Sequence, residues 1–164
     1  YSKLYSEILF ELSTIDNNVS TIILDICDKF FAEINNVRLN DNLNMDNYDE
    51  LCEIIKQKSK LASGFVFISN LYKYKIVSYE MMKNYYKSLI EFTEISTDEY
   101  IGKYIDAIVQ IISNCGDNLE KDNCEEFKDF FLDICIKLSK DKDRILPKYR
   151  FKLLDICEKY NNYT

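Results

Sequence analysis

The sequence predicts an all-α fold, and three observations support this. Only three glycines and one proline occur among 164 residues, whereas an all-β fold needs turn residues every ~8–12 positions. Apolar residues recur at the spacing i, i+3, i+4, i+7 over long segments, which is typical of amphipathic helices. A hydrophobic content of 47% with 30% charged residues is that of a globular chain rather than a disordered one. We expect about seven helices.

The first three predicted helices cover residues 2–13, 19–34 and 47–74. The first carries Leu4, Ile8, Leu9 and Leu12 on one face, and the second keeps the helical spacing for more than four turns. The third begins at Asn47, with Glu50 at the third position of a capping box. The Asn-rich residues 35–47 between them are expected to form a loop.

Each of the other four helices begins at a start signal in the sequence. The starts are, in order, Ser78, Ser96 with Glu99, Asp122 with Glu125, and Leu146-Pro147. The helices run to about Ile90, Gly116, Leu138 and Tyr160. Gly116 is expected to end its helix, because glycine suits the left-handed conformation that follows many helices.

The spacing of the predicted helices indicates repeats. Helices start roughly every 20–25 residues, so that a two-helix unit spans about 40–47 residues, the period of HEAT-type repeats. The phrase Leu-Asp-Ile-Cys also occurs three times, beginning at residues 24, 132 and 154. A helical bundle stays open on periodicity alone, but the repeat length favours an α-solenoid.

The composition argues against most catalytic chemistry. The chain has no histidine, so it offers no His-based triad or histidine metal ligand. Three glycines do not build a phosphate-binding loop, and no apolar run reaches the length of a membrane span. We therefore expect no enzyme activity, no cofactor and no metal site. The formal net charge of −7 argues against strong non-specific binding to nucleic acid.

The six cysteines form no C-x-x-C pair, and most fall on apolar helix positions. We expect them to be small buried side chains in a reducing compartment rather than a disulfide framework or a zinc site. They are Cys27, Cys52, Cys115, Cys124, Cys135 and Cys157.

Tyrosines crowd residues 72–86 beside Lys73, Lys75, Lys83 and Lys87. Two interpretations are open for this segment. Aromatic rings interleaved with lysines suit single-stranded RNA, which needs both stacking and neutralisation. Alternatively, the tyrosines pack in the core with their hydroxyls at its edge.

Three segments contain phrases that occur together in one helical protein family. Residues 62–73, ASGFVFISNLYK, are similar to the family's LGNIxFIGELYK phrase, with Ser69 and Asn70 in place of Gly-Glu. Residues 104–119 resemble a family helix that ends in a TIGxxL phrase. Residues 148–155, KYRFKLLD, look like the family's RIRFxLxD. The order and spacing of the three phrases agree with the family across residues 50–160, and the chain thus resembles the middle domain of eukaryotic translation initiation factor 4G.

The resemblance implies an α-solenoid of HEAT-type helical hairpins. Residues 1–164 would form one domain that lacks the family's first one to two hairpins, in a chain cut from a longer protein. It also implies a cytoplasmic, non-catalytic scaffold of translation initiation that binds and stimulates a DEAD-box RNA helicase of the factor 4A type. RNA and other initiation factors are further candidate partners.

The last phrase implies the residues that touch the helicase. Arg150 and Phe151 match the last-repeat surface, and Lys148 and Asp155 are their neighbours on the same helix. Two alternatives stay open. One is a related HEAT scaffold of mRNA splicing, decay or cap binding, and the other is a helical interaction module with no helicase partner.

Overall fold

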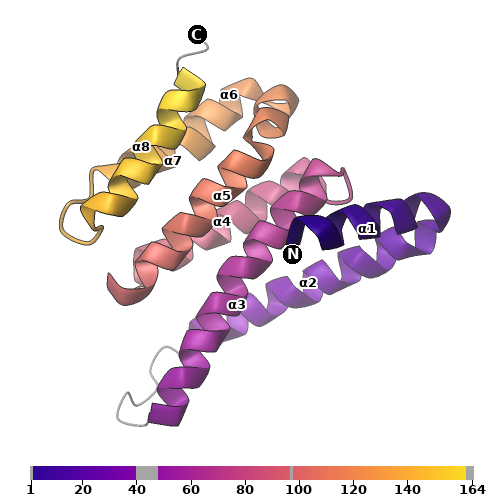
Figure 1. Cartoon of the computed structure of the whole chain (residues 1–164), viewed down its shortest axis with the longest axis horizontal. Helices are drawn as coiled ribbons and strands as arrows, with labels where there is room; N and C mark the ends of the chain where they lie inside the picture. Colours follow the sequence, from indigo (N-terminus) through magenta and orange to yellow (C-terminus); the bar gives the residue numbers. More distant parts are fainter. Residues whose placement is uncertain (1, 40–47, 97, 162–164) are drawn as a thin grey trace. The chain divides into compact units, whose positions relative to one another are not determined.

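A computed structural model describes residues 2–39, 48–96 and 98–161, with side chains for residues 2–33, 52, 56–57, 59–96 and 101–160. All secondary structure in these ranges is helical, as the sequence predicts (Figure 1). The elements are α1 Ser2–Ile15, α2 Asn17–Leu39, α3 Tyr48–Lys73, α4 Tyr79–Ile95, α5 Asp98–Asp122, α6 Cys124–Glu126, the π-helical turn η1 Phe127–Leu132, α7 Asp133–Ser139 and α8 Pro147–Asn161. Because α6, η1 and α7 follow one another directly, they form one helical segment, which gives seven segments in the described ranges.

Two predicted boundaries are wrong around the Asn-rich segment and at Ser96. Helix α2 continues to Leu39, past the expected loop start at residue 35, because asparagine costs a helix only a few tenths of a kcal/mol. The rest of that segment, residues 40–47, lies outside the described residues. Ser96 does not start α5, because its hydroxyl donates to the carbonyl of Phe92 (2.6 Å) at the end of α4, and α5 begins at Asp98.

The other start signals agree with the structure to within two residues. The Ser78 hydroxyl accepts from the N–H of Met81 (3.3 Å), as a helix cap does. Helix α6 begins one residue later than expected, because Asn123 caps it by accepting from the N–H of Glu126 (3.2 Å). Helix α8 begins at Pro147, as predicted.

Gly116 does not end α5, which continues to Asp122. The residue is buried inside the helix, and a Cβ placed there would collide with the side chain of Tyr160 from α8. The other two glycines make the same kind of contact, Gly64 with the ring of Phe30 and Gly102 with that of Tyr149. All three glycines are therefore positions of close helix contact rather than helix stops.

The chain divides into two compact units, Tyr1–Tyr85 and Tyr86–Thr164, with the boundary inside α4. The single domain and the missing hairpins stay predictions. In the first unit, α1 packs on α2 and α3. The N-terminal end of α1 lies at residue 70 of α3, and the Tyr74 hydroxyl donates to Glu7 further along α1 (2.8 Å). Helices α1 and α3 therefore run in the same sense where they touch, although they cross at an angle in Figure 1.

Alternate helices run in the same sense in the second unit as well. Gly102 and Ile112 of α5 meet Tyr149 and Tyr160 of α8 in the same order, and the Tyr160 hydroxyl lies 3.2 Å from the carbonyl of Ile112. Segment α6–η1–α7 packs against both helices. Alternate helices of the same sense are what stacked helical hairpins produce. The solenoid stays a prediction, with this support within each unit.

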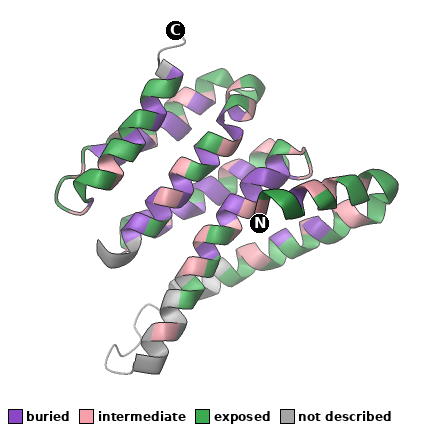
Figure 2. Cartoon of the chain, in the orientation of Figure 1, coloured by how far each residue is buried: buried purple, intermediate pink, exposed green. Residues whose placement is uncertain are grey.

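Each helical segment of the second unit has buried positions (Figure 2). Several of the largest buried side chains there are aromatic, namely Tyr86, Tyr104, Phe127 and Phe131. Tyr86 is fully buried, its ring lies 4.5 Å from that of Phe131, and its hydroxyl donates to the carbonyl of Phe131 (3.1 Å). Because burial disfavours a charged phenolate, the pKa of Tyr86 lies well above its ordinary value. The hydrogen bond removes the cost of burying the hydroxyl.

Candidate functional site

The cations of this acidic chain are concentrated in one stretch. Residues 137–152 carry seven basic and two acidic side chains, a net charge of +5, whereas the whole chain carries −7. This basic segment covers the end of α7, the connection to α8 and the first turns of α8. It includes three of the four residues predicted to touch the helicase, Lys148, Arg150 and Phe151.

Most of these cations have no carboxylate partner among the described residues. Exceptions are Arg144, whose Nε donates to Asp141 (2.8 Å), and Lys152, whose Nζ donates to Asp106 (2.6 Å). The side chains without an ion pair to a described carboxylate are Lys137, Lys140, Lys142, Lys148 and Arg150. Their charge is therefore available to an external anion.

The Arg144 side chain also fixes the connection between α7 and α8. Its Nη1 donates to the carbonyl of Glu94 at the end of α4 (2.7 Å), and its guanidinium lowers the pKa of Asp141 below the ordinary value. The Asp141 carboxylate in turn accepts from the N–H of Arg144 (3.1 Å). Residues 141–144 are thus held by charge-assisted hydrogen bonds, which are stronger than neutral ones.

Arg150 is half-buried at the inner edge of α8, one turn before the fully buried Leu153. Its Nε is buried and has no hydrogen-bond partner among the described residues. A buried donor without a partner costs about 1–3 kcal/mol of stability.

Phe151 lies beside Arg150 on the outer side of α8 and is 62% exposed. The resemblance predicts a partly exposed side chain here, and the structure agrees. Leu146, at the other end of the first turn, is 56% exposed. Between them the Tyr149 ring is half-buried, with Lys148 Nζ 4.6 Å and Lys152 Nζ 5.5 Å from its centre, both cation–π contacts. Asp155 is exposed one turn further along α8.

A groove that the sequence analysis missed adjoins the basic segment. It has a volume of about 490 Å³. Apolar side chains of α4 and α7 line it together with charged ones, namely Ile90, Glu94, Ile134, Lys137, Leu138, Lys140, Asp141 and Arg144. The run of charged residues from Lys137 onward is the one signal for it in the sequence. The groove itself could not be predicted, because it forms only where α4 lies against the α7–α8 connection.

The four lysines proposed for RNA contact lie at the end of α3, after it, and on α4. Lys73, Lys75 and Lys87 are exposed and Lys83 is half-buried. The neighbouring Tyr72, Tyr85 and Tyr86 are buried, which agrees with the packing interpretation of the cluster. Tyr74 stacks on Phe10 (ring centres 5.3 Å apart). These four rings are used by the fold and not offered to bases.

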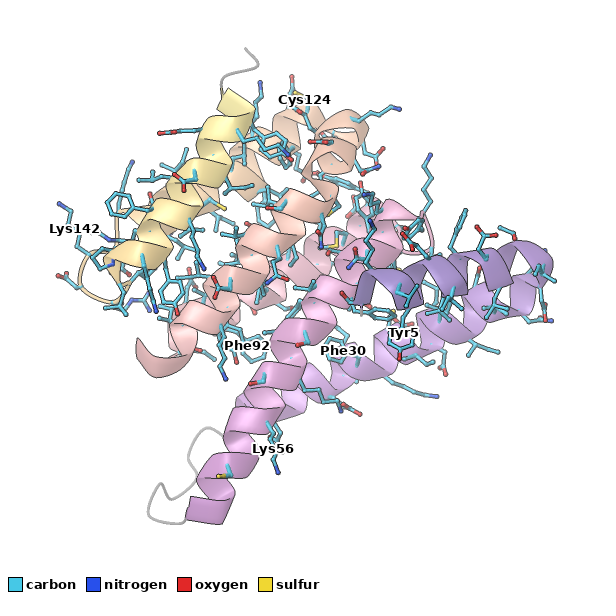
Figure 3. The ribbon with its side chains drawn as sticks, viewed as in Figure 1. Tyr5, Phe30, Lys56, Phe92, Cys124 and Lys142 are labelled. Carbon is cyan, nitrogen blue, oxygen red and sulfur yellow. The ribbon has the colours of Figure 1, made fainter. Side chains whose placement is uncertain are left out.

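The cysteines and carboxylates form no further constellation in the described ranges. Four of the six thiols are buried, at positions 27, 115, 135 and 157, as expected for small core residues. Cys52 is half-buried and Cys124 exposed (Figure 3). The described residues contain no group of three or more potential metal ligands. None of the described helices is long and apolar enough to cross a membrane.

The surface thus combines an exposed aromatic ring, cations without a carboxylate partner, and a neighbouring groove lined by both apolar and charged side chains. Such a surface suits binding to an acidic, partly apolar partner. No known protein family, curated protein or solved structure matches the chain.

Proposed function

We propose that the chain is a non-catalytic scaffold of translation initiation that binds and stimulates a DEAD-box RNA helicase of the factor 4A type. The observation that carries the proposal is the exposed Phe151 beside the unpaired Arg150 and Lys148. These are the residues that the resemblance to the factor 4G middle domain assigns to the helicase.

The physical basis is that of an interface hot spot. On binding, the Phe151 ring would lose its remaining contact with water and Arg150 would gain a carboxylate. Arginine is among the residues most enriched at hot spots, and phenylalanine is enriched at the cores of interfaces. The excess positive charge of the basic segment attracts an acidic partner and accelerates association. A HEAT-type solenoid would hold these side chains on stacked helices, and the pairs α1/α3 and α5/α8, each running in the same sense, support that architecture.

The experiment measures affinity for a factor 4A-type helicase and the rate of its ATP hydrolysis. Phe151→Ala and Arg150→Glu should each weaken binding about tenfold or more, equivalent to about 1.4 kcal/mol or more. Raising the salt concentration should weaken binding of the unchanged chain, because the attraction is screened. Lys56→Glu is the matched control, since Lys56 is an exposed lysine of α3 in the other unit (Figure 3).

Equal losses for Lys56→Glu and Arg150→Glu would contradict the assigned surface. Absence of any complex would favour the helical module with no helicase partner. Binding of a splicing or decay helicase in preference to factor 4A would favour the related HEAT scaffolds. RNA contact through Lys73, Lys75, Lys83 and Lys87 stays a separate proposal, tested by titrating single-stranded RNA against charge-reversed variants.

A further inference from the structure

Large apolar side chains are exposed on the first two helices. Seven of the eleven exposed large hydrophobic residues in the described part of the chain lie there, namely Leu4, Tyr5, Ile8, Leu12 and Ile15 of α1 and Ile22 and Ile26 of α2. Ile15 is 82% exposed. We call these seven residues the hairpin face. Figure 2 shows the exposed character of α1. Monomeric proteins rarely expose so many neighbouring apolar groups unless a partner covers them.

The apolar pattern of α1 predicts that its large side chains face the core, whereas in the structure most of them face outward. The sequence predicts one apolar face made of Leu4, Ile8, Leu9 and Leu12, and this prediction is wrong as a packing face, because Leu9 is half-buried and the other three are exposed. The buried residue of α1 is Ser6, whose hydroxyl donates to the carbonyl of Ser2 (2.9 Å). The packed side of α1 is therefore the side of Ser6, and most of the larger side chains remain outside.

Three residues of this face form a regular stripe along α1 together with Glu11. Leu4, Ile8, Glu11 and Ile15 follow one another at spacings of four, three and four, which is the spacing of a coiled-coil seam. Three of them are aliphatic, and Glu11 occupies the middle of the stripe. The Glu11 side chain is exposed, and no described residue forms an ion pair with it. A single charged residue in such a seam selects its partner.

The surroundings of the stripe are acidic. Residues 2–33 carry six carboxylates and two lysines, a net charge of −4. Three of the six carboxylates are paired, Glu7 with Lys3 (3.9 Å), Asp25 with Lys29 (2.6 Å) and Glu33 with Lys60 of α3 (3.6 Å). The other three, at positions 11, 16 and 28, form no ion pair with a described residue, so the hairpin face presents apolar area beside unpaired carboxylates.

We propose that the hairpin face binds a basic amphipathic helix of another protein, with a lysine or arginine of that helix opposite Glu11. The charge around the face distinguishes between the partners that could cover it. A second copy of this chain would bring another net charge of −4 and another Glu11. An anionic membrane surface would repel the hairpin for the same reason. A helix with an aliphatic seam and cationic flanks satisfies both the apolar side chains and Glu11.

The test uses synthetic helical peptides of about three heptads with the same leucine seam and either lysine or glutamate flanks. The full chain should bind the lysine peptide at least about tenfold more tightly than the glutamate peptide, measured by fluorescence anisotropy. Glu11→Lys should reverse this preference. Glu125→Lys, which makes the same charge change at an exposed position of α6, should leave it unchanged.

Ile8→Ser should weaken binding of the lysine peptide, and because Ile8 is only 46% exposed, a modest fall in Tm should accompany the loss of binding. Equal binding of both peptides, or an unchanged preference in Glu11→Lys, would overturn the charge argument. If sedimentation velocity shows that the unchanged chain is a dimer and that Ile8→Ser is a monomer, the face is occupied by a second copy of the chain instead. Binding to phosphatidylserine vesicles that Ile8→Ser abolishes would identify a membrane, and either result would overturn the proposal.

Discussion

Replacing Phe151 by alanine tests whether this ring belongs to a surface or to the core. The side chain is 62% exposed, so little more than a third of it is covered by the protein. A buried phenylalanine covers about 200 Å², and a third to two fifths of this is about 75 Å². At about 25 cal/mol per Å² that area contributes at most about 2 kcal/mol.

Two corrections reduce this loss. Alanine keeps the Cβ and its contacts, and it is the better helix former by about 0.5 kcal/mol. We therefore expect Phe151→Ala to lower the free energy of unfolding by about 1 kcal/mol, which moves Tm by roughly 2–4 °C in a chain of this size. The matched control is Phe131→Ala, because Phe131 is fully buried and its truncation should cost about 3–5 kcal/mol.

The assay is urea unfolding followed by far-ultraviolet circular dichroism on all three proteins. A loss in Phe151→Ala equal to that in Phe131→Ala would refute the reasoning, since it would mean that Phe151 packs in the core. A small loss of stability combined with the loss of helicase affinity described above would place the whole effect at the interface.

Three further outcomes can be checked by unfolding measurements. Gly116→Ala should lower the free energy of unfolding by about 1–3 kcal/mol through overpacking against Tyr160, although alanine is the better helix former. When Tyr160→Ala is already present, adding Gly116→Ala should cause no such overpacking loss. Asn123→Ala should cost about 1 kcal/mol, because it removes the cap that accepts from the N–H of Glu126, and an unchanged urea midpoint would contradict this. Burial raises the pKa of Cys27 to about 11 from an ordinary value of 9.0. The neutral thiol therefore contributes its full stabilisation below pH 9.0, and this contribution is lost as the pH rises through about 11. Cys27→Ala should lose less free energy of unfolding than the unchanged chain over this pH range.

The helices were predictable because each has its own apolar period and most have a local start signal. Ser78 and Pro147 act on the residues next to them, so their effect can be read without tertiary information. Gly116 could not be read in this way. Its role depends on Tyr160, which lies on another helix and reaches it only in the folded chain.

The candidate site was predictable in part for the same reason. Arg150, Phe151, Lys148 and Asp155 came from one phrase of contiguous sequence, and the exposure of Phe151 agrees with it. The groove formed by α4 and α7 depends on residues such as Glu94 and Arg144, fifty positions apart. Periodicity marks the apolar side of α1 but carries no information on whether its partner lies within the same chain.

The three glycine–ring contacts have a consequence for recognising distant relatives. A glycine that admits an aromatic ring makes the two positions change together, because a larger residue in one requires a smaller residue in the other. The pairs 30 and 64, 102 and 149, and 116 and 160 should therefore covary in any homologous chain, even where overall identity has decayed. Because two of these pairs join α5 to α8, their joint conservation would also establish the parallel register of those helices from sequence alone.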